Sequence, residues 1–265
     1  MRFHLFELED QSWFPAIIRD LATDYLNFVQ TTFELYVAMA PLLSETLKEA
    51  ETTRIVDLCS GAAGPLPILV ETLAARGIPV TATLTDLYPN HRAFERTKLR
   101  SKGRIDFHRD PVDARTIPRS LPGLRTLFNA FHHFRPQDAL AVLRSAAKDR
   151  QPIAIFEVSE RTPKMILGVL LTPLFVWLLT PFIHPFRWRR LFWTYLLPMV
   201  PLTCLWDGIV SQLRAYTVPE LQRMGAAAGA MRWRIGQAPL AIGRGRLTYM
   251  IGIPEPYTFA SERRE

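Results

Sequence analysis

The chain has 265 residues, 48% of them hydrophobic, and a formal net charge of +7 at pH 7. A chain of this length can bury a full core and is most simply one domain with additions. Its two cysteines, Cys59 and Cys204, exclude a disulfide framework and a CxxC metal site, which is typical of the reducing cytoplasm. The positive charge suits anionic partners, but without a long Lys/Arg run a solvated basic surface is the simpler interpretation.

Residues 1–53 are predicted to be helical. The first ten residues, MRFHLFELED, carry acidic side chains and lack an apolar core, so they do not indicate a secretory signal. Apolar residues at helical spacing predict one helix from about Trp13 to Thr32, and a second is expected from Phe33 to Ala50.

The next stretch, residues 54–67, reads RIVDLCSGAAGPLP. Its apolar run predicts a buried strand, small residues follow, and helical periodicity begins after Pro65. Small residues let a ligand approach the backbone, and a helix N-terminus offers unpaired N–H groups, so this order is typical of a nucleotide-type pocket. The Lys of a GxxxxGK[ST] loop is missing, and Cys59 fills the first glycine position of GxGxxG. Asp57 before the turn favours a cationic or hydroxyl-bearing ligand over a pyrophosphate.

These residues resemble motif I of the class I S-adenosylmethionine (SAM)-dependent methyltransferases, which usually reads D/E-x-G-x-G-x-G. Here the match is Asp57-x-Cys59-x-Gly61-x-Ala63 followed by Gly64, so two of the three glycines are replaced. The resemblance implies an enzyme of this class with SAM as its cofactor, bound by the turn residues Asp57, Cys59, Ser60, Gly61 and Gly64. An ordinary tight turn between a strand and a helix is the alternative.

The same resemblance gives residues 1–53 a role as a helical lid over the cofactor. Trp13, Phe14 and Tyr25 then become lid candidates. For each of these aromatic residues, plain packing is the alternative.

Two acidic residues at later strand ends extend the resemblance. Residues 79–86, PVTATLTD, predict a strand that ends in Asp86. In a doubly wound sheet a carboxylate at this strand end can bind both ribose hydroxyls of a nucleoside, and Leu87 is expected on the adenine face. A helix cap is the alternative for Asp86. A third strand, ending at about residue 112, leads into Asp113 and Ala114, which resemble the family segment that contacts the adenine amino group; an Asx turn is the alternative.

A fourth strand, residues 124–130, contains Asn129 as a further expected cofactor contact and is followed by His132 and His133. Ligands in open α/β sheets collect at the carboxyl ends of strands, so the methyl acceptor is expected here. An imidazole can accept a proton from an acceptor hydroxyl or amine, which makes His133 the first candidate base and His132 the second. Paired histidines also bind metals, but no third ligand lies nearby at a known spacing, so no metal site is predicted. Alternatively, both histidines only cap the strand and pack under a loop.

The remaining elements complete an alternating pattern. A helix is predicted at 136–150, a strand at 152–158, a helix after a capping box of Thr217 and Glu220, and strands at 231–236 and 247–253. This pattern predicts an α/β fold: a Rossmann-like, seven-stranded, mostly parallel sheet with helices on both faces, which resembles the class I methyltransferase core. The expected division is an N-terminal helical lid at 1–53, a SAM-binding core at 54–160, an apolar insertion at 161–214, the C-terminal part of the core sheet at 215–256 and a tail at 257–265.

The insertion is unusually apolar. Residues 165–183 contain no charge over nineteen positions, and residues 191–206 add sixteen more that Pro198 and Pro201 interrupt. A single membrane span is excluded because the last two strands must return to the same sheet, and a double span would put three arginines of 184–190 outside. A shallow membrane contact is therefore favoured. The alternatives are an apolar wall over the active site and a homodimer interface.

The predicted function is methyl transfer from SAM to a hydrophobic small molecule or lipid-like acceptor, in the cytoplasm or at the inner membrane face. Asp207, directly after the apolar run, is a further candidate for positioning the acceptor, or it simply pairs with Arg214. The alternative function is a catalytically silent SAM-binding or membrane-associated scaffold, which the replaced glycines keep open. Nucleic acid is not an expected partner, because the [DNS]PP[YFW] motif is missing after the fourth strand and the insertion is apolar where a basic groove should lie.

Overall fold

A computed structural model describes residues 2–240 and 245–255 and contains one seven-stranded sheet. The strand order is β3-β2-β1-β4-β5-β7-β6, in which β1 to β5 are parallel and β7 runs antiparallel to β5 and β6. The predicted seven-stranded, mostly parallel sheet is confirmed. The strands are β1 Arg54–Asp57, β2 Thr81–Leu84, β3 Ile105–Phe107, β4 Leu124–Phe128, β5 Ile153–Glu157, β6 Met231–Pro239 and β7 Arg246–Pro254.

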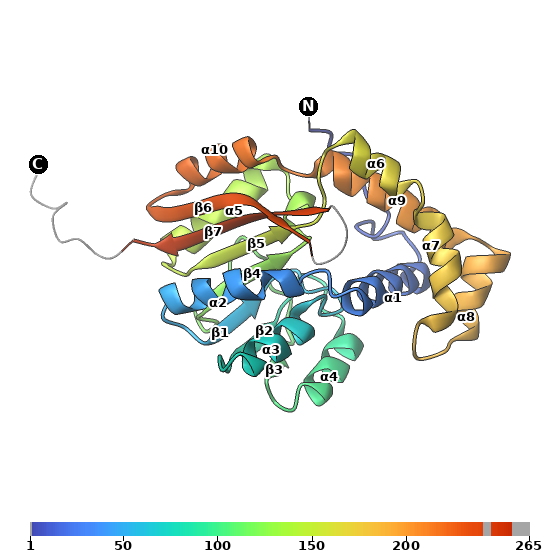
Figure 1. Ribbon diagram of the computed structural model, residues 1–265, viewed down its shortest axis with the longest axis horizontal. Helices are drawn as coiled ribbons and strands as arrows, with labels where there is room; N and C mark the ends of the chain where they lie inside the picture. Colours follow the sequence, from blue (N-terminus) through green and yellow to red (C-terminus); the bar gives the residue numbers. More distant parts are fainter. Residues whose placement is uncertain (1, 241–244, 256–265) are drawn as a thin grey trace, which may run out of the picture.

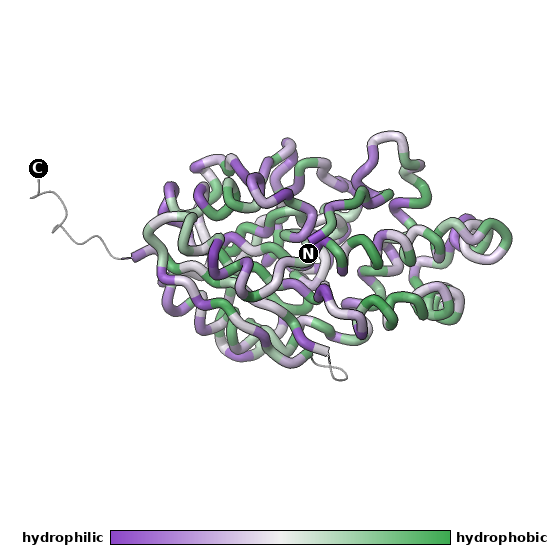
Figure 2. The backbone as a smooth tube through the Cα atoms, turned by 90° about the horizontal axis from the view of Figure 1, so that it is seen from above, coloured by the Kyte–Doolittle hydropathy of each residue, from purple (hydrophilic) through white to green (hydrophobic). Residues whose placement is uncertain are grey.

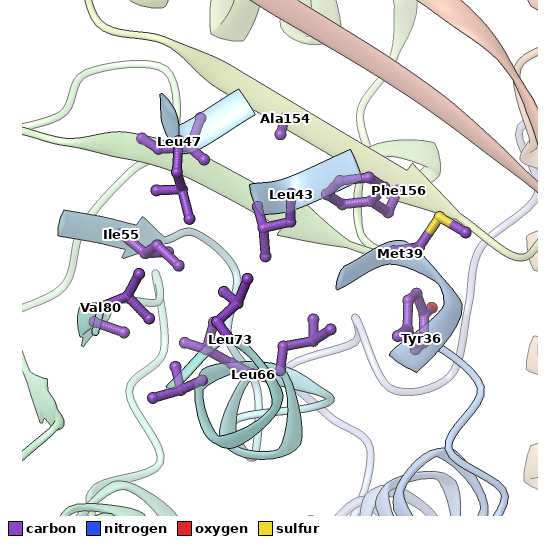
Figure 3. Close-up of a cluster of buried hydrophobic side chains, with 14 of the residues drawn as sticks. Tyr36, Met39, Leu43, Leu47, Ile55, Leu66, Leu73, Val80, Ala154 and Phe156 are labelled. Carbon is purple, nitrogen blue, oxygen red and sulfur yellow. The ribbon is translucent and has the colours of Figure 1, made fainter. Parts of the chain in front are cut away.

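Helices cover both faces of this sheet (Figure 1). On one face, α2 (Ala40–Glu49), α3 (Leu66–Ala75) and α4 (His91–Arg100) contribute to a buried apolar cluster with β1, β2 and β5. Figure 3 shows Leu43 of α2 and Leu73 of α3 near Ile55 of β1, with Phe156 of β5 close to Leu43. On the other face, α5 (Pro136–Lys148) and α10 (Val218–Ala228) form a second cluster with β1, β4 and β5. These two cores fix the carboxyl ends of the parallel strands at one edge.

Local sequence signals explain most of the elements. Thr217 and Glu220 form the predicted capping box at the start of α10. The helix predicted from Trp13 to Thr32 is observed as α1, Ala16–Thr32. Most expected bounds differ from the observed ones by one to three residues, and two expectations were wrong by more. The third strand ends at Phe107 instead of residue 112. The second N-terminal helix does not begin at Phe33, because Glu34 adopts a left-handed conformation (φ 48°); a short 3-10 helix, η1 (Val37–Met39), and α2 follow.

The apolar insertion folds as a set of short helices at one end of the molecule (Figure 1). It contains α6 (Pro163–Val169), α7 (Thr172–Leu179), η3 (Thr180–Phe182), α8 (Trp188–Leu191), a π-helical turn at Phe192–Leu196 and α9 (Met199–Arg214). It packs on α1 through a third buried cluster, made of Phe14, Ile18, Leu21, Ala22, Tyr25, Val176, Ile183, Val200 and Cys204.

Among the described residues, Pro163–Phe182 is long and apolar enough to cross a membrane, and only 11% of its apolar window is buried. The stretches Trp188–Leu196 and Met199–Arg214 pass the same test as a pair bent by 72°. In Figure 2, several stretches of the chain at this end of the molecule have the apolar colour.

Candidate functional site

The turn after β1 has the backbone of a glycine-rich loop although two glycines are replaced. Cys59, Gly61, Ala63 and Gly64 have φ values of 55°, 52°, 79° and 45°, all in the left-handed region that favours glycine. The backbone N–H of Ser60 donates to the carbonyl of Thr85 at 3.0 Å, which ties the turn to the end of β2. The residues Cys and Ala thus adopt the conformation expected of the glycines they replace.

Asp57 organises this turn from inside. Its two carboxylate oxygens accept hydrogen bonds from the hydroxyls of Thr126 and Ser60, each at 2.7 Å, and the residue is 3% exposed. Burial raises the pKa of Asp57 to about 7, although these two hydrogen bonds oppose the rise. The predicted cofactor residue therefore supports the turn, and each of its oxygens already accepts one hydrogen bond from a buried hydroxyl.

Asp86 lies beyond β2, beside the turn. One carboxylate oxygen accepts the backbone N–H of Gly61 at 2.9 Å and the other accepts that of Tyr88 at 2.8 Å. The helix-cap alternative for Asp86 is wrong, because the side chain of Asn90 caps α4 by accepting the N–H of Ala93. Leu87 is 42% exposed, so its side chain is available to a ligand.

The segment after β3 joins the same edge. The backbone N–H of Val112 donates to the carbonyl of Asp86 at 2.8 Å, and Ala114 is buried nearby. Asp113 accepts the N–H of Arg115 at 2.8 Å and pairs with its guanidinium at 2.7 Å. This hydrogen bonding holds the pKa of Asp113 below its ordinary value. The local turn is thus what the structure shows for Asp113, whereas its contact with adenine stays a prediction.

Asn129 connects β4 to the end of β5. It has a φ of 50°, and its side-chain carbonyl accepts the N–H groups of Val158 and Ser159 at 3.2 and 3.3 Å. These bonds keep the carboxyl ends of the two strands together. The role of Asn129 as a cofactor contact stays a prediction.

His132 and His133 lie in η2 (Phe131–His133), directly after β4, but in different surroundings. His132 is 1% exposed, and its Nδ1 lies 2.6 Å from a carboxylate oxygen of Glu157. His133 is more open, with 26% of its side chain exposed. Its Nδ1 lies 3.1 Å from Asp10 and 3.2 Å from Glu7. Burial lowers the pKa of His133, but these two carboxylates outweigh it and raise the pKa to about 10. A histidine in that state donates a hydrogen bond at neutral pH and does not accept a proton.

The N-terminal segment, residues 2–10, supplies acidic groups that the sequence did not point to. The carboxylate of Asp207 accepts the N–H groups of Leu8 and Glu9 at 2.6 and 3.2 Å. Arg214 pairs with Glu7 and Asp10 at 3.2 and 2.9 Å, so its proposed pairing with Asp207 is wrong. The signal available in the sequence was the close spacing of three acidic residues, Glu7, Glu9 and Asp10, in a basic chain.

Asp207 thus contacts the N-terminal segment through both of its oxygens. Burial raises the pKa of Asp207 to about 6. Its role in positioning an acceptor stays a prediction.

A cavity of about 340 Å³ lies beside the turn, between α1, α3, α4 and residues 183–185. Gly64 is the one predicted cofactor residue in its lining, and none of the candidate catalytic residues borders it. The cavity is therefore a neighbour of the predicted site and not the site itself.

The strand order, the antiparallel last strand and the left-handed turn after β1 define the class I SAM-dependent methyltransferase fold, as predicted. No protein-family model matches the chain, and no curated protein matches its sequence. Solved structures do match. The chain is similar to the plantazolicin methyltransferase BpumL in complex with SAH, at 12% identity and a TM-score of 0.59, over 94% of each chain.

Two other methyltransferases are similar over most of this chain. Human N-acetylserotonin methyltransferase in complex with SAM is 16% identical with a TM-score of 0.52, over 93% of this chain. An O-methyltransferase-like protein from Nostoc punctiforme is 12% identical with a TM-score of 0.50, over 91% of this chain. The present chain spans 60% of the length of each of these two proteins. At these identities the likeness establishes the fold alone.

Proposed function

We propose that this chain is a SAM-dependent methyltransferase acting on a hydrophobic small-molecule or lipid-like acceptor, peripheral to the cytoplasmic face of a membrane. One observation carries the first part of the proposal. The left-handed turn at residues 59–64 is bonded through Gly61 to the carboxylate of Asp86, within the methyltransferase fold. In this arrangement, a backbone that a ligand can approach closely lies beside a carboxylate that can bind a ribose. Both lie at the carboxyl ends of neighbouring strands.

The residues at this edge fit a nucleoside ligand. A Cβ built on Gly61 meets no described atom within 4 Å, so the turn has open space on that side. The carboxylate of Asp86 uses one acceptor position on each oxygen for backbone N–H groups, which leaves others for two ribose hydroxyls. Leu87 and Tyr88 are exposed next to it and can pack on a flat ring. The retained turn conformation supports cofactor binding despite the replaced glycines, on which the alternative of a silent scaffold relied.

SAM would supply the sulfonium methyl group for an in-line displacement. The chain's own contribution would be to hold the acceptor in line with that methyl group, which is the main source of rate in such a transfer. The carboxyl end of β4, where η2 lies, is where an acceptor is expected in an open α/β sheet.

The insertion supports an apolar acceptor and a membrane surface. Large apolar side chains are exposed along it, among them Leu167, Leu170, Leu171, Leu174, Phe175, Trp177, Leu178, Phe182, Trp188, Leu196 and Leu202. An exposed apolar area of this extent marks an interaction surface. The exposed Arg189 lies in the same segment, where a guanidinium group suits anionic lipid headgroups. Because Val176 is buried against α1, the insertion lies beside the rest of the fold, which favours shallow contact.

Calorimetric titration with SAM and S-adenosylhomocysteine tests the cofactor assignment. Wild-type protein is expected to bind both, and Asp86→Ala to bind at least tenfold more weakly. Asp106→Ala is the matched control, because this exposed aspartate of the outer strand β3 pairs with Lys98 of α4. Folded wild-type protein that binds neither ligand would overturn the proposal.

A further inference from the structure

Glu7, His132 and His133 form a compact group although two distant segments supply them. One nitrogen or oxygen atom from each lies within 4.8 Å of the others. Glu7 is fully buried and His132 is 1% exposed, whereas His133 forms the open side of the group. The N-terminal segment thus provides the third ligand that the spacing around the histidine pair lacked.

Two buried atoms in this group have no hydrogen-bond partner among the described residues. They are Nε2 of His132 and Oε2 of Glu7. The Oε2 atom lies 3.2 Å from Nδ1 of His133, but without hydrogen-bond geometry. Buried polar atoms are normally satisfied, so two such atoms in one group indicate a missing partner.

The remaining atoms of these side chains are held from behind. A carboxylate oxygen of Glu157 lies 2.6 Å from Nδ1 of His132, and the other accepts the N–H of Phe131 at 2.7 Å. The Oε1 atom of Glu7 accepts the hydroxyl of Ser211 at 3.1 Å and lies 3.2 Å from Arg214. The Nε2 atom of His132 and the Oε2 atom of Glu7 therefore stay free, whereas Nδ1 of His133 also contacts Asp10. A carboxylate behind a histidine is typical of metal sites.

Charge and distance favour a cation. Three carboxylates, those of Glu7, Asp10 and Glu157, surround the histidines. The guanidinium of Arg214 pairs with the first two, and that of Arg2 donates to the carbonyl of His132 at 2.8 Å, so the carboxylates outnumber the guanidiniums. Two ligands bound tetrahedrally at about 2.0–2.1 Å from an ion lie about 3.3 Å apart. The separation of 3.2 Å between His133 and Glu7 is close to that value.

We propose that Glu7, His132 and His133 bind one divalent transition-metal cation. Two imidazole nitrogens and one carboxylate suit Zn²⁺, Mn²⁺ and Fe²⁺, and three protein ligands leave a position open for water or a substrate oxygen. The group lies just beyond β4, so the open position would hold an acceptor oxygen. This second role depends on the proposed methyl transfer, whereas cation binding does not.

The alternative to a bound cation is a metal-free group in which a protonated His133 lies between Glu7 and Asp10. A metal titration distinguishes these two states. Untagged full-length protein, stripped with chelator and dialysed, is titrated with Co²⁺ and Zn²⁺. We expect one cation per chain and the visible Co²⁺ absorption of a site with imidazole and carboxylate ligands. Affinity should fall more than tenfold in Glu7→Gln and in His133→Ala, and 10–100-fold in Glu157→Gln.

His108→Ala is the matched control, because this histidine contacts the carbonyl of Asp110, away from the group, and it should bind like wild type. Circular dichroism confirms that each variant is folded. Absence of binding by folded wild type, or equal binding by Glu7→Gln and His133→Ala, would overturn the proposal. Asp86→Ala should lose SAM and keep the cation, so failure of the metal site and failure of the cofactor site are distinguishable.

Discussion

The backbone N–H of Gly61 donates to the carboxylate of Asp86 at 2.9 Å, and this bond joins the turn after β1 to the end of β2. One carboxylate therefore shapes the loop and, in the proposed function, binds the ribose. Substitutions of Asp86 test this double role, because asparagine keeps one acceptor oxygen and alanine keeps none.

Asp86→Asn is expected to bind SAM more weakly than wild type but more tightly than Asp86→Ala. The amide can still accept a hydrogen bond from Gly61 or a hydroxyl, whereas alanine can do neither. A hydrogen bond to a charged group contributes about 1.5–3 kcal/mol, so a loss of at least tenfold is expected for alanine. Calorimetric titration of the three proteins measures the order. Equal affinity of all three would exclude Asp86 as a ribose ligand.

The buried Asp57 predicts that stability changes with pH. Its pKa in the folded chain is about 7, above the ordinary value of 3.8, so the folded state holds this proton over a range where the unfolded state has lost it. Its contribution to stability is present below about pH 4, falls as the pH rises towards 7 and is constant above that. The slope for one proton is about 1.4 kcal/mol per pH unit.

Chemical denaturation of wild type and Asp57→Asn at pH 5, 6, 7 and 8 checks this expectation. The difference in unfolding free energy between the two proteins should change between pH 5 and 7 and level off near pH 8. Asp106→Ala is the control, because this exposed aspartate has a lowered pKa and so does not hold its proton in that range. A difference that is the same at every pH would show that Asp57 is already ionised in the folded chain.

The hydrogen bonds between Asp207 and the N-terminal segment give the third prediction. Asp207→Ala removes the acceptor of the half-buried N–H groups of Leu8 and Glu9, and a hydrogen bond to a charged group contributes about 1.5–3 kcal/mol. We expect a loss of that order in the free energy of unfolding, together with faster proteolytic cleavage within residues 2–10. Asp207→Asn should lose less, because its amide oxygen still accepts one of the two bonds. Unchanged cleavage in Asp207→Ala would show that other contacts hold the segment.

Local signals predicted the core well, and distant contacts account for what was missed. The apolar run Ile55 to Leu58, the turn after it and the capping box at Thr217 depend on neighbours in the chain, and the observed elements agree. By contrast, Asp10 meets Arg214, 204 positions away, and no periodicity links such residues. The third ligand for the histidine pair was missed for the same reason, since Glu7 comes from the other end of the chain. The break at Glu34 was missed because a single left-handed residue leaves no apolar pattern.

The exposed apolar face of α7 makes the last prediction. Leu174 and Leu178 are 49% and 58% exposed, four positions apart, so they lie on one side of the helix. The double variant Leu174→Glu/Leu178→Glu should keep its fold, because neither side chain is in the core. It should bind vesicles of anionic phospholipid at least tenfold more weakly in a flotation assay, since it loses apolar area and gains two charges that the headgroups repel.

Leu99→Glu is the matched control for this variant. Leu99 is 80% exposed and belongs to α4, outside the exposed apolar face of the insertion, so the same added charge should leave vesicle binding unchanged. Gel filtration of wild type and the double variant distinguishes contact with a membrane from contact with a second copy of the chain. A wild type that floats with vesicles and elutes as a monomer supports the membrane contact. A wild type that elutes as a dimer, does not float and becomes monomeric in the double variant would instead assign this face to a homodimer interface.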